Sequence, residues 1–307
     1  MKEAAVVIFV RLIVGLLFSS CIGLLAYRRK SLTVSGIAGA ILTGTLIFGL
    51  GGLVSGLLLI AFFITSSLLS HYKTSRKQKV AEQFDKGSQR DLGQALANGG
   101  AAAFFALCGG IAWLLNSSAL LVMVCFAAMV GALASANADT WATELGVLSK
   151  VPPRLITHPA QVVEPGTSGG ITRNGTLAAA GGALFIGLVN LLCALMAALL
   201  PFESSLWPAL YNLRAIGDAG FALLLVAAAL IGGITGALTD SLLGASAQAI
   251  YFSAKRNKPT ERRIEWDGTP NRLLKGRAWL NNDWVNFIAS LAGAAVAGLL
   301  VLVMVAR

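Results

Sequence analysis

Long apolar segments separated by short polar ones follow one another along almost the whole chain. Each is about 20 residues or more, enough as an α-helix to cross a hydrocarbon core of roughly 30 Å. The seventh is longer than the others and must tilt, kink or project from the membrane. The pattern predicts an all-α polytopic membrane bundle of eight spans, at residues 4–26, 32–50, 53–70, 94–115, 118–137, 176–200, 218–248 and 284–306.

The composition agrees with this prediction. Of 307 residues, 56% are hydrophobic and only 12% are charged, about half of the charge that a soluble domain carries. The 34 glycines lie mostly inside the apolar segments, where small residues let helix backbones approach closely. We therefore expect one integral membrane domain over residues 1–307. The first segment contains Arg11 and has no small-residue cleavage site before Arg28, so we interpret it as a retained span.

The basic residues predict the orientation. With eight spans, 20 of the 24 Lys and Arg fall on one side, in the turn at 28–30 and in the loops 71–93, 138–175 and 249–283. By the positive-inside rule this side is cytoplasmic, so both termini are expected on the non-cytoplasmic side of the plasma membrane, inner membrane or an organelle equivalent. Topology and anionic lipid headgroups account for the net charge of +10, so we expect membrane lipids and no nucleic acid as partners. The oligomeric state stays open.

A first polar patch continues span five at its cytoplasmic end. On a helix, Asn137, Thr140 and Glu144 share one face, with Asp139 and Thr143 on the adjacent row. Carboxylates at the end of a membrane helix are costly unless they bind something, and hard oxygen ligands suit Mg²⁺. The alternative is a helix end that emerges into water with a solvated acidic cluster.

A second patch is rich in glycine and hydroxyl residues. Its glycines allow successive backbone N–H groups to face one anion, and the next span begins near Thr176, so a helix N-terminus is also available to phosphate. The patch is not a Walker A loop, because no Gly-Lys-Ser/Thr follows the glycines. The alternative is a flexible turn. The predicted cradle consists of Gly166, Thr167, Ser168, Gly169 and Gly170, with Arg173 as a counter-charge.

A third patch lies in span seven, where Asp240, Gly244 and Gln248 repeat every four residues and line one face, with Ser241 beside them. An acid embedded among apolar and small residues is a candidate functional group, although a salt bridge to a neighbouring helix would also explain it.

A fourth patch opens span eight. Asp283 and Asn286 stand on one face. Helix capping explains one of the nearby asparagines, including Asn282, but does not explain Asn286 inside the span. Asn98, at the start of span four, is a lesser candidate that helix packing would also explain.

These patches share one location, the cytoplasmic ends of the spans. Carboxylates from three helices, flanked by cations and a Gly-rich loop, are typical of a metal–phosphate site. We predict Asp139, Glu144 and Asp240 as Mg²⁺ ligands, with Asp283 and Asn286 on the side of a substrate phosphate. Lys150 and Arg173 would neutralise donor phosphates, and the neighbouring helices would offer an apolar groove for a lipid tail.

Four stretches in this order also resemble a known family. They are ASANADTWATELG, PGTSGGITRNGTLAA, GALTDSLLGASAQ and NNDWVNFIAS. They resemble the membrane proteins that include plant phytyl-phosphate kinase and the animal transmembrane protein nineteen, related to phytol and polyprenol kinases. The resemblance covers roughly spans two to eight. It implies a membrane kinase of about eight spans that uses CTP, or another nucleoside triphosphate, and a divalent metal to phosphorylate an isoprenoid substrate.

Our leading hypothesis is therefore phosphoryl transfer from a nucleoside triphosphate, with CTP as the expected donor, to an isoprenoid lipid phosphate such as phytyl phosphate. No strong nucleophile is required, because the substrate phosphate attacks in line. The alternative is a membrane carrier of a small anion or a lipid phosphate. Acids within the membrane and a seventh span interrupted by glycines would also suit a carrier. In the loop 249–283, aromatic residues alternate with cations, which predicts a segment at the headgroups or a lid that grips the donor base.

Overall fold

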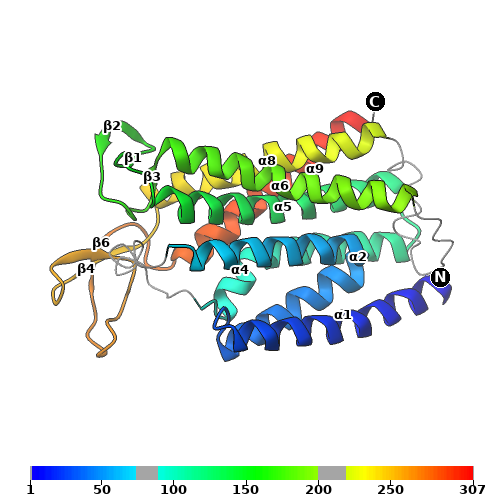
Figure 1. The fold of residues 1–307 in the computed structure, drawn as a ribbon, viewed down its shortest axis with the longest axis horizontal. Helices are drawn as coiled ribbons and strands as arrows, with labels where there is room; N and C mark the ends of the chain where they lie inside the picture. Colours follow the sequence, from blue (N-terminus) through cyan, green and yellow to red (C-terminus); the bar gives the residue numbers. More distant parts are fainter. Residues whose placement is uncertain (1, 74–88, 200–218, 307) are drawn as a thin grey trace.

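Within the described residues, seven long helices form one bundle, and two small sheets lie at one end of it (Figure 1). This computed structural model describes residues 2–73, 89–199 and 219–306. All seven helices are long and apolar enough to cross a membrane, so the predicted multi-pass helical architecture is confirmed. The helices are α1 (Lys2–Arg28), α2 (Val34–His71), α4 (Leu92–Leu114), α5 (Ala119–Gly146), α6 (Arg173–Leu199), α8 (Ala219–Ser246) and α9 (Asn282–Val305).

The second and third predicted spans are the two arms of α2. As a straight helix its 38 residues would measure about 57 Å, well beyond the thickness of a membrane. Gly52 instead takes a φ of 84°, which glycine adopts without steric cost. A Cβ at Gly56 would meet the ring of Phe48 at 2.5 Å, so the second arm returns along the first. The seven helices of the described residues therefore run along the bundle eight times, as the eight predicted spans require.

The chain direction agrees with an even number of passes. The start of α1 and the end of α9 lie at the same end of the bundle, opposite the sheets (Figure 1). The polar loops that carry most of the described basic residues lie at the other end. The side of the membrane on which each end lies stays a prediction.

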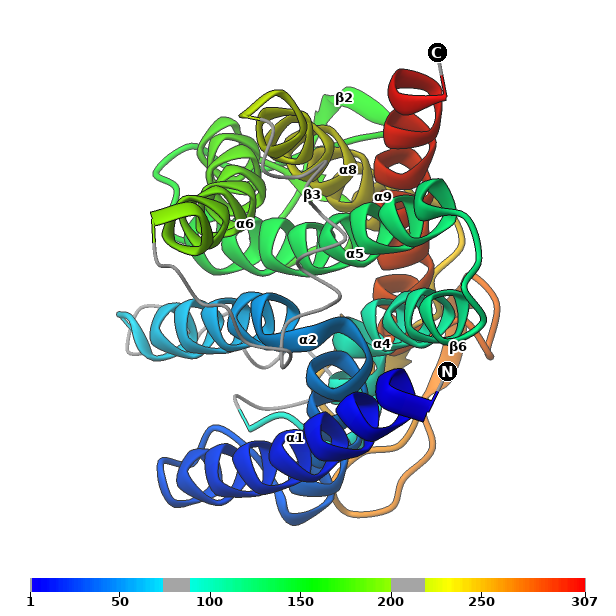
Figure 2. The ribbon, with the colours of Figure 1, turned by 90° about the vertical axis from the view of Figure 1, so that its right-hand side faces the viewer.

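Helix α5 is the centre of the bundle. It contacts α2, α4, α6, α8 and α9, and Figure 2 shows it between α6 and α8 on one side and α4 on the other. Small side chains such as Ala127 and Ala134 are fully buried along it, which allows the close approach that membrane helices use for packing. Asn137 adds a polar tie, because its Nδ2 donates to the Gly182 carbonyl at 2.8 Å and its Oδ1 accepts from Thr65 at 3.1 Å.

Three glycines bring α5, α8 and α9 into backbone contact. A Cβ at Gly131 or at Gly232 would stand 2.6 Å from the carbonyl oxygen of Gly293. Asp139 and Asp240 each follow their glycine by eight residues, about two helical turns towards the sheets. The glycine contact thus places these two acids close together at the polar end of the bundle.

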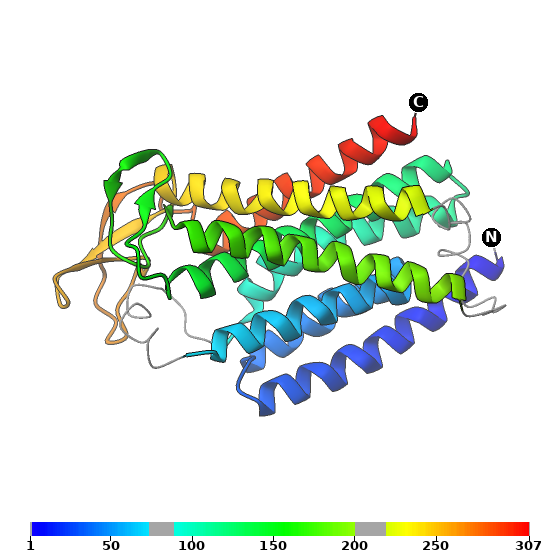
Figure 3. The ribbon, with the colours of Figure 1, turned by 45° about the horizontal axis from the view of Figure 1, so that its top comes forward.

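The polar end carries two three-stranded sheets that were not predicted. Their strands pair in the orders β2-β1-β3 and β5-β4-β6, and all pairs are antiparallel. Figure 3 shows both sheets beyond the ends of the helices. The strands are β1 (Arg154–Leu155), β2 (His158–Val162), β3 (Gly170–Ile171), β4 (Ile250–Ser253), β5 (Lys258–Thr260) and β6 (Arg272–Lys275).

Candidate functional site

A cavity of about 580 Å³ opens at the polar end of the bundle. It lies where α5 and α8 end and where α4, α6 and α9 begin. Residues from all four polar patches line it, so the convergence expected from the sequence is present in the fold. The predicted residues that line it are Asn98, Asp139, Thr140, Glu144, Gly166, Thr167, Ser168, Gly169, Gly170, Asp240, Ser241, Gln248, Asn282, Asp283 and Asn286.

Two carboxyl groups from different helices lie side by side in this cavity. Asp139 and Asp240 are close enough for a direct side-chain interaction, and the charge of Glu261 also acts on Asp240. Asp240 Oδ2 is buried and accepts no hydrogen bond from any group that the structure describes. Neighbouring buried carboxylates repel unless a proton or a cation lies between them. Mg²⁺ commonly binds through one or two carboxylates, water and substrate phosphates, so this pair fits the predicted metal.

Glu144 does not join the pair. Its Oε1 accepts a hydrogen bond of 2.6 Å from Ser70, and its charge acts on Arg90. No group of three His, Cys, Asp or Glu side chains within the described ranges is arranged to hold a metal ion. The structure therefore brings Asp139 and Asp240 together but not Glu144, so the predicted three-carboxylate set is not formed. The reason is that Glu144 lies five residues beyond Asp139, on a different side of α5.

Three helix N-termini face the same cavity. Asp91 caps α4 in a capping box with Gln94. Thr172 accepts from Gly175 N at 3.0 Å before α6, and Asn281 accepts from Trp284 N at 3.1 Å at the start of α9. Each N-terminus carries a partial positive charge from the helix dipole. The acid Asp91 at α4 and the acid Asp283 in the first turn of α9 offset this charge, so the N-terminus of α6, beside the neutral Thr172, is the one that favours an anion such as phosphate.

The Gly-rich loop is firmly held against α8. Gly166 and Gly169 have φ angles of 89° and 81°, which explains why glycine occupies both positions. A Cβ at Gly169 would stand 2.5 Å from the backbone nitrogen of Ala245. Gly170 N donates to the Thr167 carbonyl at 2.9 Å. The loop is thus an ordered double turn that forms one wall of the cavity.

The β4–β6 sheet contributes a residue that the sequence did not single out. Glu261 lines the cavity, and its Oε1 accepts hydrogen bonds of 2.8 Å from both Ser168 and Gln248. It therefore connects the sheet to the Gly-rich loop and to the end of α8. Figure 1 shows β4 and β6 projecting beyond the helices, and Glu261 brings this part of the loop 249–283 to the cavity; its position relative to the headgroups stays a prediction.

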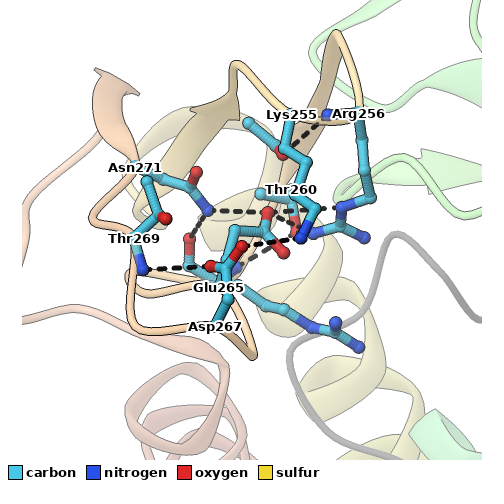
Figure 4. Close-up of polar contacts among 9 residues, drawn as sticks. Lys255, Arg256, Thr260, Glu265, Asp267, Thr269 and Asn271 are labelled. Atoms are coloured by element: carbon cyan, nitrogen blue, oxygen red, sulfur yellow. Dashed lines mark hydrogen bonds and ion pairs between the residues drawn. The ribbon is translucent and has the colours of Figure 1, made fainter.

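A polar network holds the sheet in shape (Figure 4). Arg256 pairs with Glu265 at 2.8 Å, and Asn271 donates to the same carboxylate at 3.1 Å. Hydrogen bonds from Ser253, Arg256 and Asn271 lower the pKa of Glu265 to about 2. The carboxylate therefore stays ionised at all physiological pH values.

Three predicted residues do not line the cavity. Lys150 and Arg173 are exposed and stand outside its described lining, because the turn after α5 and the first turn of α6 direct them to solvent. Asn137 is fully buried and ties α5 to α2 and α6, a packing role. Among the described lining residues the cation is Arg90, which the distribution of basic residues alone had explained as a determinant of orientation.

Other lining residues were also missed. Gln94 precedes Asn98 by four positions, which places both on one face of α4, and this spacing could have identified it. Ser70 and Thr172 also line the cavity, but isolated hydroxyl residues at helix ends carry no specific signal.

Comparison with known proteins identifies relatives over nearly the full chain. The family described as integral membrane protein DUF92 matches residues 17–294. Protein PGR of Arabidopsis thaliana is 34% identical over 287 residues, 92% of this chain and 93% of that protein. The uncharacterized membrane protein MJ0933 of Methanocaldococcus jannaschii is 29% identical over 289 residues, 94% of this chain and 93% of its own length. No solved structure matches the chain significantly. These names state no activity, so the kinase activity implied by the resemblance stays a prediction.

Proposed function

The chain belongs to the integral membrane protein family DUF92, and we propose that it is a membrane phosphotransferase that phosphorylates an isoprenoid monophosphate. The donor is a nucleoside triphosphate, with CTP expected. One observation carries the proposal: a pair of acids, Asp139 and Asp240, lines the same cavity as the Gly-rich loop and the N-terminus of α6. Such a site combines a place for a divalent cation with places for phosphate groups.

Each wall of the cavity has a role in the proposed reaction. Asp139 and Asp240 would hold Mg²⁺, which when bound neutralises phosphate charge. The Gly-rich loop 166–170 and the N-terminus of α6 would bind the donor phosphates. Asp283 and Asn286, at the start of α9, would position the acceptor on the opposite side.

The reaction needs no strongly activated nucleophile. An oxygen of the acceptor phosphate attacks the γ-phosphorus, a new P–O bond forms, and the bridging bond between the β- and γ-phosphates breaks. The nucleoside diphosphate then leaves. Catalysis of this kind depends on positioning and charge stabilisation, which agrees with the absence of His and Cys from the described cavity lining.

The carrier hypothesis receives less support. It depended on a span seven interrupted by glycine, whereas α8 is one continuous helix from Ala219 to Ser246. Its glycines instead permit close packing, since a Cβ at Gly233 would stand 2.5 Å from Ala183. The cavity also lies at one end of the bundle and not at its middle, where carriers bind their substrates.

A transfer assay with two labels tests the proposal. Purified protein in detergent receives Mg²⁺ and CTP or ATP labelled at either the α- or the γ-phosphate, with a panel of isoprenoid alcohols and monophosphates. We expect γ-label, and no α-label, in the diphosphate formed from a monophosphate, and we expect EDTA to abolish it. Transfer of α-label would indicate nucleotidyl transfer. Absence of transfer to every acceptor would contradict the proposal, and uptake of labelled lipid phosphate into proteoliposomes would then support the carrier.

A further inference from the structure

A second, apolar cavity lies beside the first. Its volume is about 90 Å³, and it lies between α1, both arms of α2 and the start of α4. The larger apolar side chains that line it include Phe18, Ile22, Phe48, Leu59, Phe62 and Phe63. Arg90, Gln94 and Asn98 line both cavities. The boundary between the polar and the apolar cavity is therefore formed by one cation and two amides.

Arg90 is fixed at this boundary by its own backbone. Its N–H donates to the Ser31 carbonyl at 3.0 Å, and its carbonyl accepts from Thr33 N at 3.0 Å. A Cβ at Gly36 would collide with the Arg90 carbonyl oxygen, so α2 approaches this segment closely only because residue 36 is glycine. The turn between α1 and α2 thus holds Arg90 in place.

The side chain of Arg90 faces both environments. Its guanidinium lies 5.5 Å from the ring centre of Phe62 and 5.8 Å from that of Phe63, on the apolar side. On the polar side the charge of Glu144 acts on it. Burial lowers the pKa of Arg90 to about 10, while Glu144 opposes this shift, so the group remains a cation at neutral pH. A guanidinium in this position suits a phosphate, which it can bind through two parallel hydrogen bonds.

We propose that Arg90 and Gln94 bind the phosphate of the lipid acceptor and that the apolar cavity takes the first carbons of its hydrocarbon chain. This inference rests on the proposed function, because it identifies where the acceptor of that reaction binds. An anionic head followed directly by an apolar chain matches the sequence of environments around Arg90. The phosphate then enters the polar cavity beside α4, where Arg90, Gln94 and Asn98 line it.

The position of α1 provides a path for the rest of the chain. Helix α1 lies at the edge of the bundle, packed on α2 and apart from α6, α8 and α9 (Figure 2). Its outer side chains, such as Leu17 and Leu24, are exposed to the space that lipid fills. A volume of about 90 Å³ corresponds to about three water molecules, so it holds only a few carbons and the remainder runs between α1 and α2 into the bilayer.

Two substitutions distinguish the binding of the acceptor's phosphate from the binding of its hydrocarbon chain, and each has a matched control. Arg90→Gln removes the charge that binds phosphate, and Arg29→Gln, an exposed cation at the same end of α1, is its matched control. Ala40→Leu fills the apolar cavity, because Ala40 lines it. Ala38→Leu is the control, because Ala38 is exposed on the same helix and outside the described lining. Arg90→Lys keeps the charge but not the paired hydrogen bonds.

Binding of a radiolabelled C20 isoprenoid monophosphate to the full-length protein in nanodiscs tests the inference without catalysis. We expect Arg90→Gln to weaken binding about tenfold to a hundredfold and Arg90→Lys to weaken it less. Ala40→Leu should weaken it about tenfold without changing the binding of labelled nucleotide. Melting temperatures of all variants verify folding. The inference is wrong if Arg90→Gln binds the monophosphate as tightly as Arg29→Gln does, and Ala40→Leu as tightly as Ala38→Leu does.

The same preparations distinguish this inference from the proposed function. If the wild-type protein binds the monophosphate with this dependence on Arg90 and Ala40 but transfers no phosphate, the site stands and the kinase function fails. If phosphate is transferred with an unchanged acceptor KM in Arg90→Gln and Ala40→Leu, the kinase function stands and this site is overturned.

Discussion

The contact of three glycines provides a direct test of how the fold builds the site. Replacing Gly131 with Ala would place a Cβ 2.5 Å from Ala297 Cβ and 2.6 Å from the Gly293 carbonyl oxygen, whereas real Cβ atoms essentially never come within 3.0 Å of another group. One of the close neighbours is backbone and cannot rotate away. Helices α5 and α9 must therefore separate by roughly half an ångström, because interiors are close-packed.

The energetic cost follows from this separation. Overpacking of a close-packed core typically costs about 1–3 kcal/mol, while Gly→Ala within a helix gains up to about 1 kcal/mol in helix propensity. Gly181→Ala is the matched control, since a Cβ there meets only Trp141 at 3.8 Å. The difference between the two variants cancels the propensity gain. We expect the free energy of unfolding of Gly131→Ala to be about 1–3 kcal/mol lower than that of Gly181→Ala.

Unfolding in mixed detergent, followed by tryptophan fluorescence, measures this difference. Because Asp139 lies two turns beyond Gly131, the same substitution should lower kcat for phosphoryl transfer by about tenfold through displacement of the acid pair. Gly131→Ala with a stability equal to or above that of Gly181→Ala would refute the packing argument. A stability loss with unchanged kcat would show that the glycine contact does not position Asp139.

Three further substitutions or conditions test single contacts. Asn137→Leu removes the hydrogen bonds to Thr65 and Gly182, so the free energy of unfolding should fall by about 1 kcal/mol while the donor KM stays the same; unchanged stability would contradict this. The lowered pKa of Glu265, about 2, means that its contribution to the sheet is complete above pH of about 4.3 and is lost as the pH falls towards 2. Corrected amide exchange of residues 250–275 should therefore be constant from pH 7 to 5 and should rise only at lower pH; a rise beginning near pH 6 would oppose it. Ser168→Ala removes one bond to Glu261 and should speed amide exchange in residues 164–171, and exchange equal to wild type would show that this bond does not hold the loop.

The sequence predicted the membrane architecture well because a membrane imposes simple rules. Segment length and the distribution of Lys and Arg together indicate eight spans, and α2 does fold back at Gly52, between the second and third of them. The meeting of Asp139 and Asp240 was also predictable, since both lie at the end of a span that leaves the membrane on the same side.

Other features depend on packing that a single sequence does not display. The strand β2 is exposed along its whole length, so it lacks the alternation by which a strand is identified. Glu261 reaches the cavity only because the sheet folds towards the Gly-rich loop. Arg90 was counted only among the basic residues that predict the orientation. Arg173 was assigned to phosphate because of its neighbours in sequence, although α6 directs it to solvent.

The acid pair Asp139 and Asp240 is central to the proposed phosphoryl transfer. The most direct test compares Asp139→Asn and Asp240→Asn with wild type in the γ-label transfer assay, with the exposed Asp267→Asn as an isosteric control. A cation held by this pair would contribute several kcal/mol to the transition state, so each substitution should lower kcat about a hundredfold or more, while Asp267→Asn stays at the wild-type rate. Full activity in both Asp139→Asn and Asp240→Asn would contradict the account.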